Sequence, residues 1–369
     1  MKKITFIQLI VISLILFSPF VSLGGNEQRA GSAGASELLI NPWARSSGFA
    51  DANMSCIHGL EALYSNVAGI AFTQKTELIF ARTSWLTGSG INFNSFGLTQ
   101  KVGEAGVIGI SGMTLDAGEI EIRTVDSPEG GIGTFNPKFT NISLAYAKEF
   151  SNSIYGGLAV KVVSGGISDL NTSSVSIDAG IQYVTGVGKD KAGNRRQDNL
   201  RFGISMKNVG PTMVYKGDGL SFRGTVPSGV SMTLEQRSAE FELPSLIKIG
   251  FSLHFNLTPV VDTIAKKVRS DNKLAVAGTF TSNSFTKDQY HVGLEYSWRD
   301  IVFVRGGYVY EKGIFNADDR TTALTGPAAG VTFNIPLNKE KGTIFAIDYS
   351  YRDTNPFSGI HSIGVRVTL

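Results

Sequence analysis

The chain has 369 residues, a net charge of +3 and a single cysteine, Cys56. So small a net charge gives no indication of nucleic-acid binding, and one cysteine excludes an internal disulfide. Mean hydropathy is only +0.05, and beyond the first 24 residues no apolar run is long enough to cross a bilayer as a helix. Transmembrane β-barrels hide their hydrophobicity in alternation, so composition excludes a multi-helix membrane protein but permits a barrel.

The N-terminus has the pattern of a secretory signal peptide. Lys2 and Lys3 precede a mostly apolar run over 4–23, and the small residues Ser22 and Gly24 suit cleavage by signal peptidase. The alternative, a retained membrane anchor, is disfavoured by Pro19 and by these small residues. We therefore expect residues 1–24 to be removed, and the lack of a cysteine near the cut excludes lipoprotein processing.

Residues 25–75 differ in composition and residue spacing from the rest of the chain. Ala, Gly, Ser and Asn dominate, and the spacing fits short helices and turns rather than strands. About fifty semi-apolar residues before a wide barrel need a place to fold, and side chains of the wall alone do not fill an interior of that width. The sequence therefore predicts an N-terminal plug segment over 25–75, inside a barrel formed by 76–369.

The remaining chain repeats one pattern, an apolar residue at every second position, which is the period of a β-strand with one apolar and one polar face. The last residues show it well: Ile363, Val365 and Val367 alternate with Gly364 and Arg366. We count fifteen candidate strands, and because single-chain bacterial barrels have even strand numbers, we expect about fourteen. The candidates are 76–84, 91–101, 106–114, 119–126, 139–150, 153–163, 174–184, 200–207, 247–255, 272–281, 290–299, 301–310, 325–334, 343–351 and 360–369.

The two faces of these strands predict a transmembrane barrel. One face carries aromatic and β-branched residues, as lipid contact requires. The opposite face carries charges, which are costly in lipid but tolerated in a wet or ion-paired lumen. These charged residues are Lys161, Asp178, Arg201, Lys207, Lys248, Glu295, Arg305, Asp348 and Arg366. The rival fold, a soluble β-sandwich, would turn the apolar face inward; the long uninterrupted run of strands behind a signal peptide favours an all-β transmembrane antiparallel barrel in the cell outer membrane.

The connections are uneven in length. Two-residue turns at Ser151-Asn152 and Arg299-Asp300 contrast with long loops at 185–199, 210–243, 257–272 and 311–325. Barrels usually have short periplasmic turns and long extracellular loops, so we expect the long loops outside. The 210–243 loop contains apolar residues suited to binding a partner, namely Met213, Val214, Leu220, Phe222, Val226 and Val230.

Two short stretches before the first strand resemble the PorV/PorQ-like family of outer-membrane proteins. The first, over 38–52, contains Pro42, Trp43, Ala44 and Arg45 before a small-residue helix. The second, over 65–71, resembles an Asn-Pro-Ala-Gly-Leu-Ala element of the broader FadL-like barrels. It is carried by Asn66, Ala68 and Gly69, with Val67 in place of the usual Pro. Residues 243–250 and 361–366 are also similar to family elements.

This resemblance implies a FadL-like barrel of fourteen strands with an N-terminal plug, in a Bacteroidota-like bacterium. It further implies a non-enzymatic role in the type IX secretion system. The partners would be outer-membrane lipid, the translocon barrel of that system, and secreted proteins carrying C-terminal signal domains.

The sequence gives no sign of catalysis, of a cofactor or of a metal site. It contains no G-x-S-x-G, H-E-x-x-H or Walker pattern, and its four histidines lie far apart. Three functions therefore remain: a secretion-system barrel that binds protein cargo or the translocon through its loops, a FadL-type channel for hydrophobic small molecules, and a purely structural partner barrel. The channel requires an apolar route past the plug.

Overall fold

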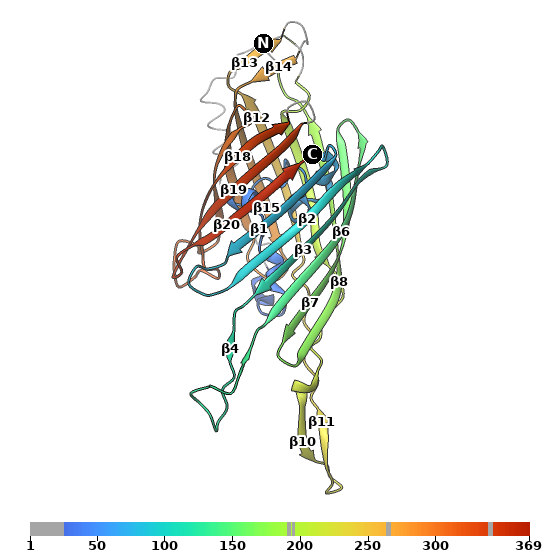
Figure 1. Ribbon diagram of the computed structural model, residues 1–369, viewed down its shortest axis with the longest axis vertical. Coiled ribbons are helices and arrows are strands. Elements are labelled where there is room, and N and C mark those ends of the chain that lie inside the picture. The colour runs from blue at the N-terminus through green and yellow to red at the C-terminus, as the bar shows by residue number, and fades with distance from the viewer. Residues whose placement is uncertain (1–25, 190–192, 194–195, 263–266, 339–341) are drawn as a thin grey trace.

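The body of the protein is a closed antiparallel β-barrel of fourteen strands (Figure 1). The computed structural model describes residues 26–369 except 190–192, 194–195, 263–266 and 339–341, so the expected signal peptide lies outside the described residues. The barrel strands are β1 (Thr76–Ser84), β2 (Asn92–Val102), β3 (Gly106–Asp116), β6 (Lys138–Ser151), β7 (Ile154–Ile167), β8 (Leu170–Thr185), β9 (Leu200–Val209), β12 (Leu246–Asn256), β15 (Asn272–Asn283), β16 (Gln289–Trp298), β17 (Val302–Glu311), β18 (Leu324–Asn338), β19 (Thr343–Thr354) and β20 (Ile360–Thr368). The predicted architecture and strand number are confirmed.

The first and last strands close the barrel. β1 and β20 pair antiparallel with Ala81 opposite Gly364, and the amide of Leu369 donates to the carbonyl of Thr76 at 2.9 Å. Closure removes the free edges that would leave backbone groups unpaired in lipid. The terminal alternation therefore marks the strand that completes the sheet.

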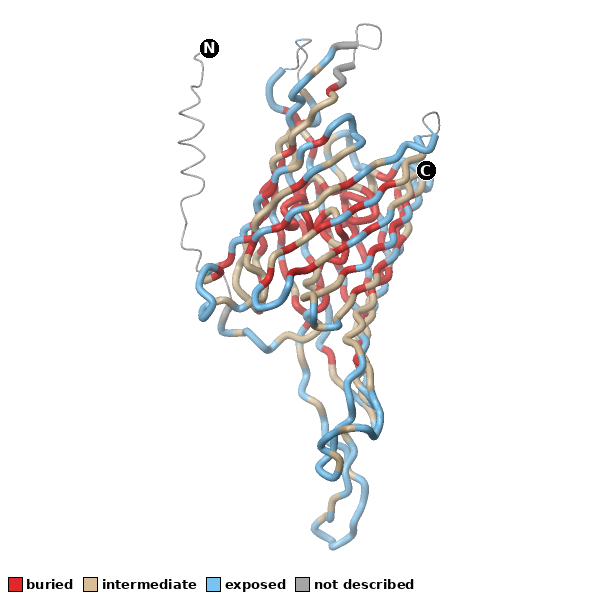
Figure 2. The backbone as a smooth tube through the Cα atoms, turned by 60° about the vertical axis from the view of Figure 1, so that its left-hand side comes forward, coloured by how far each residue is buried: buried red, intermediate tan, exposed pale blue. Residues whose placement is uncertain are grey.

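Alternate residues of each strand face the outside and the lumen of the barrel, as the period of two predicts. On β1, Phe80 is 55% exposed while its neighbour Ala81 is 1% exposed. On β20, Ile363 faces outward and Gly364 inward. Figure 2 shows the buried residues concentrated in the middle of the barrel, where residues 26–75 fill the interior. The apolar set therefore lies on the outer surface of the barrel, as expected for lipid contact, and the charged set lies inside.

Three small hairpins lie outside the barrel. β4 (Ile120–Glu121) pairs with β5 (Thr134–Phe135), and β10 (Ser221–Thr225) pairs with β11 (Ser231–Glu235). Both extend from the same end, at the bottom of Figure 1, whereas β13 (Pro259–Asp262) and β14 (Lys267–Ser270) lie at the other end with the C-terminus. The candidate strand over 119–126 is therefore not part of the wall.

The long loops do not all lie at one end, contrary to expectation. Consecutive antiparallel strands place their connections at alternate ends, so the loops at 210–243 and 311–325 share one end while those at 185–199 and 257–272 share the other. The two longest connections, 117–137 and 210–245, lie together at the end opposite the C-terminus (Figure 1). We refer to this end as the hairpin end.

Short helices connected by turns make up the N-terminal segment, residues 26–75. They are η1 (Glu27–Arg29), η2 (Ser36–Leu39), α2 (Ala44–Gly48), α3 (Ala62–Ser65) and η3 (Val67–Phe72); one further turn of helix, η4 (Asp218–Leu220), precedes β10. α2 contacts β17 to β20, and η3 contacts β3 and β6 to β8, so the segment reaches opposite walls. Among the described residues, no helix has both the length and the apolar character needed to cross a membrane.

Candidate functional site

The first sequence motif places an arginine among carboxylates in the lumen. Pro42, Trp43 and Ala44 are buried, and Arg45 follows them on α2. Trp43 belongs to an apolar cluster formed by the N-terminal segment and the wall. Because the cluster fixes the start of α2, it also fixes where the guanidinium lies.

Acidic side chains from four separate parts of the chain raise the pKa of Arg45. Burial lowers the pKa of the Arg45 guanidinium, but the charges of Glu61, Glu295, Asp348 and Glu77 raise it by more, so its pKa is raised overall. Three of these carboxylates belong to barrel strands and one to the N-terminal segment. Arg45 therefore links the segment electrostatically to the wall.

Two carboxylates of the segment are satisfied by polar partners. The hydroxyl of Ser46 donates to Glu61 at 2.9 Å, and burial raises the pKa of the Glu61 carboxyl. Asp51 accepts hydrogen bonds from the amide of Asn41 and, at 3.1 Å, from the guanidinium of Arg352 on β19. Burial raises the pKa of Asp51, but the charges of Arg352, Lys248 and His291 and the hydrogen bond from Asn41 together lower it by more, so its pKa is lowered overall. The Asp51–Arg352 ion pair is a second link to the wall.

The second motif, at Asn66, Ala68 and Gly69, packs against the opposite side of the barrel. Asn66 caps η3 by accepting from the Ala68 amide at 3.2 Å, and it donates to the carbonyl of Ile181 on β8 at 3.1 Å. A Cβ at Gly69 would lie 2.3 Å from the carbonyl oxygen of Ile57, so only glycine fits there. We therefore attribute this motif to tight packing rather than to a catalytic or ligand-binding role.

Inward-facing glycines let the N-terminal segment pack closely against the barrel wall. A Cβ on Gly307 would lie 2.7 Å from the Cβ of Ala50, and one on Gly203 would lie 2.9 Å from the sulfur of Met54. Such separations are shorter than real contacts, so the segment occupies the space of the missing side chains. The wall glycines within 3.2 Å of the segment by this measure are Gly97, Gly109, Gly157, Gly180, Gly203, Gly250, Gly293, Gly307 and Gly330.

These glycines lie beside one another across the sheet. Gly157 pairs with Gly180, Gly203 with Gly250, and Gly293 with Gly307. We call the nine residues the glycine belt. Because the belt spans β2 to β18, the segment is packed against most of the circumference rather than against one side.

Several other inward charges pair with one another, as expected for a mixed-charge lumen. Lys161 lies 2.7 Å from Asp178, and the guanidinium of Arg305 pairs with Glu295. The ammonium of Lys207 lies 3.5 Å from the ring centroid of Tyr64, a residue of α3. Breaking a buried pair leaves an uncompensated charge, so this interior resists rearrangement.

The residues predicted to bind a partner have different surroundings. Phe222 and Val230, on and beside the β10–β11 hairpin, are 52% and 56% exposed, whereas Met213 is 2% exposed. Met213 is wrongly predicted as a surface residue, because its backbone bridges to Phe241 and its side chain packs against Leu38 of the N-terminal segment. The half-buried members are Val214, Leu220 and Val226.

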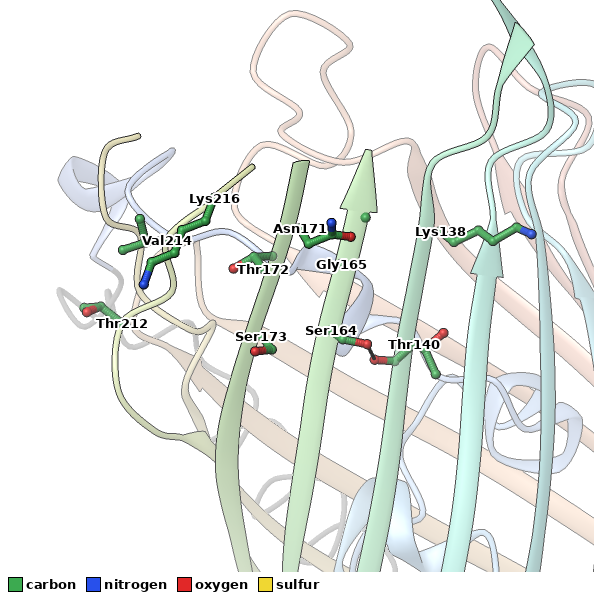
Figure 3. Close-up of a pocket in the computed structure, with 11 residues that line it drawn as sticks. Lys138, Thr140, Ser164, Gly165, Asn171, Thr172, Ser173, Thr212, Val214 and Lys216 are labelled. Carbon is green, nitrogen blue, oxygen red and sulfur yellow. Dashed lines mark hydrogen bonds between the residues drawn. The ribbon is translucent and has the colours of Figure 1, made fainter. Parts of the chain in front are cut away.

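Two cavities adjoin these regions. A small one, of about 30 Å³, lies between the segment and the wall near Trp43 and Tyr64. A larger one, of about 590 Å³, lies at the hairpin end between β6, β7, β8 and the chain over 212–216 (Figure 3). Hydroxyl and amide side chains dominate the lining of the larger cavity.

Sequence reasoning missed the glycine belt and the carboxylates around Arg45. Gly203, Gly250 and Gly293 belong to the inward-facing sets of their strands. Small inward residues at the same level of neighbouring strands were therefore the sequence pattern that could have indicated the glycine belt. Over the described ranges, no three His, Cys, Asp or Glu side chains form a group suited to a metal ion.

No protein-family model matches the chain, and no curated protein matches it. Solved structures do match. The CymD monoaromatic hydrocarbon channel is 10% identical with a TM-score of 0.52, covering 89% of this chain and 97% of its own. The Pseudomonas putida toluene transporter TodX is 11% identical with a TM-score of 0.51 and the same coverage. A Pseudomonas aeruginosa FadL homologue is 11% identical, with a TM-score of 0.47 and coverage of 88% and 96%. At such low identity CymD and TodX share the fold of this chain, which is a FadL-like barrel; these neighbours are named as transport proteins rather than enzymes.

Proposed function

We propose that this protein is a non-enzymatic outer-membrane barrel that binds other proteins at its hairpin end. The observation that carries the proposal is the glycine belt, because it packs residues 26–75 against the wall and leaves the barrel a scaffold rather than an open pore. A barrel filled in this way acts through its surfaces. The end of the barrel that carries the C-terminus would then face the periplasm.

The resemblance over 38–52 and 65–71 narrows this proposal to the type IX secretion system. The partners would be secreted proteins with C-terminal signal domains, the translocon barrel, or both. Phe222 and Val230 supply exposed apolar area. Burying each large apolar side chain on a partner stabilises a complex by roughly 1.5–3 kcal/mol, which suits a transient complex once the costs of association are subtracted.

The second candidate, a channel for hydrophobic small molecules, is the one that the structural comparisons favour. CymD is named as a monoaromatic hydrocarbon channel and TodX as a toluene transporter, and both share this fold. A hydrophobic solute would have to pass the glycine belt and the buried ion pairs, Lys161–Asp178 among them. The channel therefore requires residues 26–75 to move.

Deletion of the gene separates the two candidates. The secretion role predicts that proteins with C-terminal signal domains accumulate in the periplasm or disappear from the surface, while uptake of toluene and long-chain fatty acids is unchanged. An unchanged surface and secreted proteome, together with slower uptake of these solutes, would establish the channel instead. Complementation with the full-length gene is the control for both measurements.

A further inference from the structure

The larger cavity lies on the outer surface of the wall, directly beyond its lipid-facing apolar band. Thr140 of β6 pairs with Ser164 of β7, two positions beyond the outward-facing pair Ile142 and Val162, which are both 51% exposed. Alternation places Thr140 and Ser164 on this same outward face. The outer surface therefore changes from apolar to hydroxyl-bearing within two residues along each strand.

The same change occurs on the next strand. Val175 of β8 pairs with Val162, and the following outward pairs are Ser173 with Ser164 and Asn171 with Gly166. Three adjacent strands thus end their apolar surface at one height and continue as a polar groove of about 590 Å³ (Figure 3). That volume lies within the range of about 300–1,000 Å³ typical of small-ligand sites.

Two lysines flank the groove. Figure 3 shows Lys138 at the β6 side and Lys216 at the opposite side, with the row of hydroxyl and amide groups between them. The residues lining the groove include no carboxylate. Acidic residues lie close by: Asp116, the cross-strand neighbour of Lys138, accepts from Asn136 at 2.9 Å, and Glu240 accepts from the lining residue Thr212 at 3.1 Å.

We propose that this groove binds the phosphorylated sugar headgroup of a lipid in the outer leaflet. The height of the groove, at the edge of the apolar band, matches the position of a headgroup whose acyl chains lie along Ile142, Val162 and Val175. Lysine ammonium groups bind phosphate through charge-assisted hydrogen bonds, and the serine, threonine and asparagine side chains suit sugar hydroxyls. The inference rests on the outer-membrane placement proposed above, but not on either proposed role.

The test is native mass spectrometry of the full-length protein in detergent, titrated with deep-rough lipopolysaccharide. The wild type should bind it, and Lys138→Gln with Lys216→Gln should weaken binding about tenfold or more, because two charge-assisted contacts are lost. The matched control is Lys101→Gln with Lys148→Gln, which removes the same charge at the other end of the barrel and should bind like the wild type.

A second double variant keeps the charge of the groove and changes its shape. Ser164→Leu with Ser173→Leu extends the apolar band into the groove and should also weaken binding, while heat-modifiability on gels reports that each variant is folded. Equal binding by the wild type and both groove variants would overturn the proposal. Phosphatidylglycerol bound as tightly as the glycolipid would overturn the role of the sugar. Free glucose 1-phosphate bound as tightly would overturn the lipid as the source.

Discussion

Adding a side chain to the glycine belt should loosen the N-terminal segment. In Gly307→Val, the new Cβ would lie 2.7 Å from the Cβ of Ala50 and 2.8 Å from the carbonyl oxygen of Phe49, before the two further methyl groups are counted. Because both neighbours belong to a packed segment, they cannot move alone. Overpacking of this kind costs about 1–3 kcal/mol, which corresponds to an unfolding equilibrium shifted about 5- to 150-fold.

The adjacent residue provides a matched control. Gly306 faces outward on the same strand, and a Cβ there would meet its nearest neighbour, the carbonyl oxygen of Ala328, at 3.9 Å. Valine suits a strand position facing lipid, so Gly306→Val should be as stable as the wild type.

Urea unfolding in lipid vesicles, followed by tryptophan fluorescence, measures the free energies of unfolding. We expect Gly307→Val to unfold at lower urea than both Gly306→Val and the wild type. If the two variants have the same midpoint, the segment does not fill the space beside Gly307 and the packing argument is refuted.

Three further perturbations test other parts of the structure. Deleting residues 364–369 should prevent accumulation in the outer membrane, because β1 loses its partner; a folded, heat-modifiable truncated protein at normal levels would contradict closure by β20. Arg45→Met should destabilise the protein by about 3 kcal/mol, since carboxylates are left uncompensated, and an unchanged urea midpoint would show that they do not depend on Arg45. Because burial raises the pKa of Glu61 above 4.5, its contribution to stability is full below pH 4.5 and is lost as pH rises through the raised value. Glu61→Gln should therefore weaken the pH dependence of the midpoint between pH 4.5 and 8, and an identical profile would contradict the raised pKa.

The faces of the strands were predictable from the sequence because alternation is a local property. The side chains of 360–369 point as their period of two requires, and the same holds for the charged inward set. The segment over 119–126 shows the limit of this signal. A short alternating run has the same pattern whether it pairs into the wall or, as Ile120 does with Phe135, into a hairpin beyond it.

The individual contacts inside the barrel could not be predicted, because they join distant parts of the chain. Arg45 is influenced by Glu295 and Asp348, and Asp51 pairs with Arg352. The backbone of Met213 forms a bridge to Phe241, and no local sequence pattern predicts this pairing. The motif residues were found by resemblance, whereas their contacts, such as those of Arg45 with carboxylates and of Asn66 with Ile181, required the fold.

The central claim, that residues 26–75 close the lumen, is tested most directly by conductance in planar lipid bilayers. The intact protein should give little or no steady current. Deletion of residues 26–72, with the signal peptide retained, should give large and stable channels. Porin-like conductance from the intact protein, or an equally closed barrel after the deletion, would contradict the account.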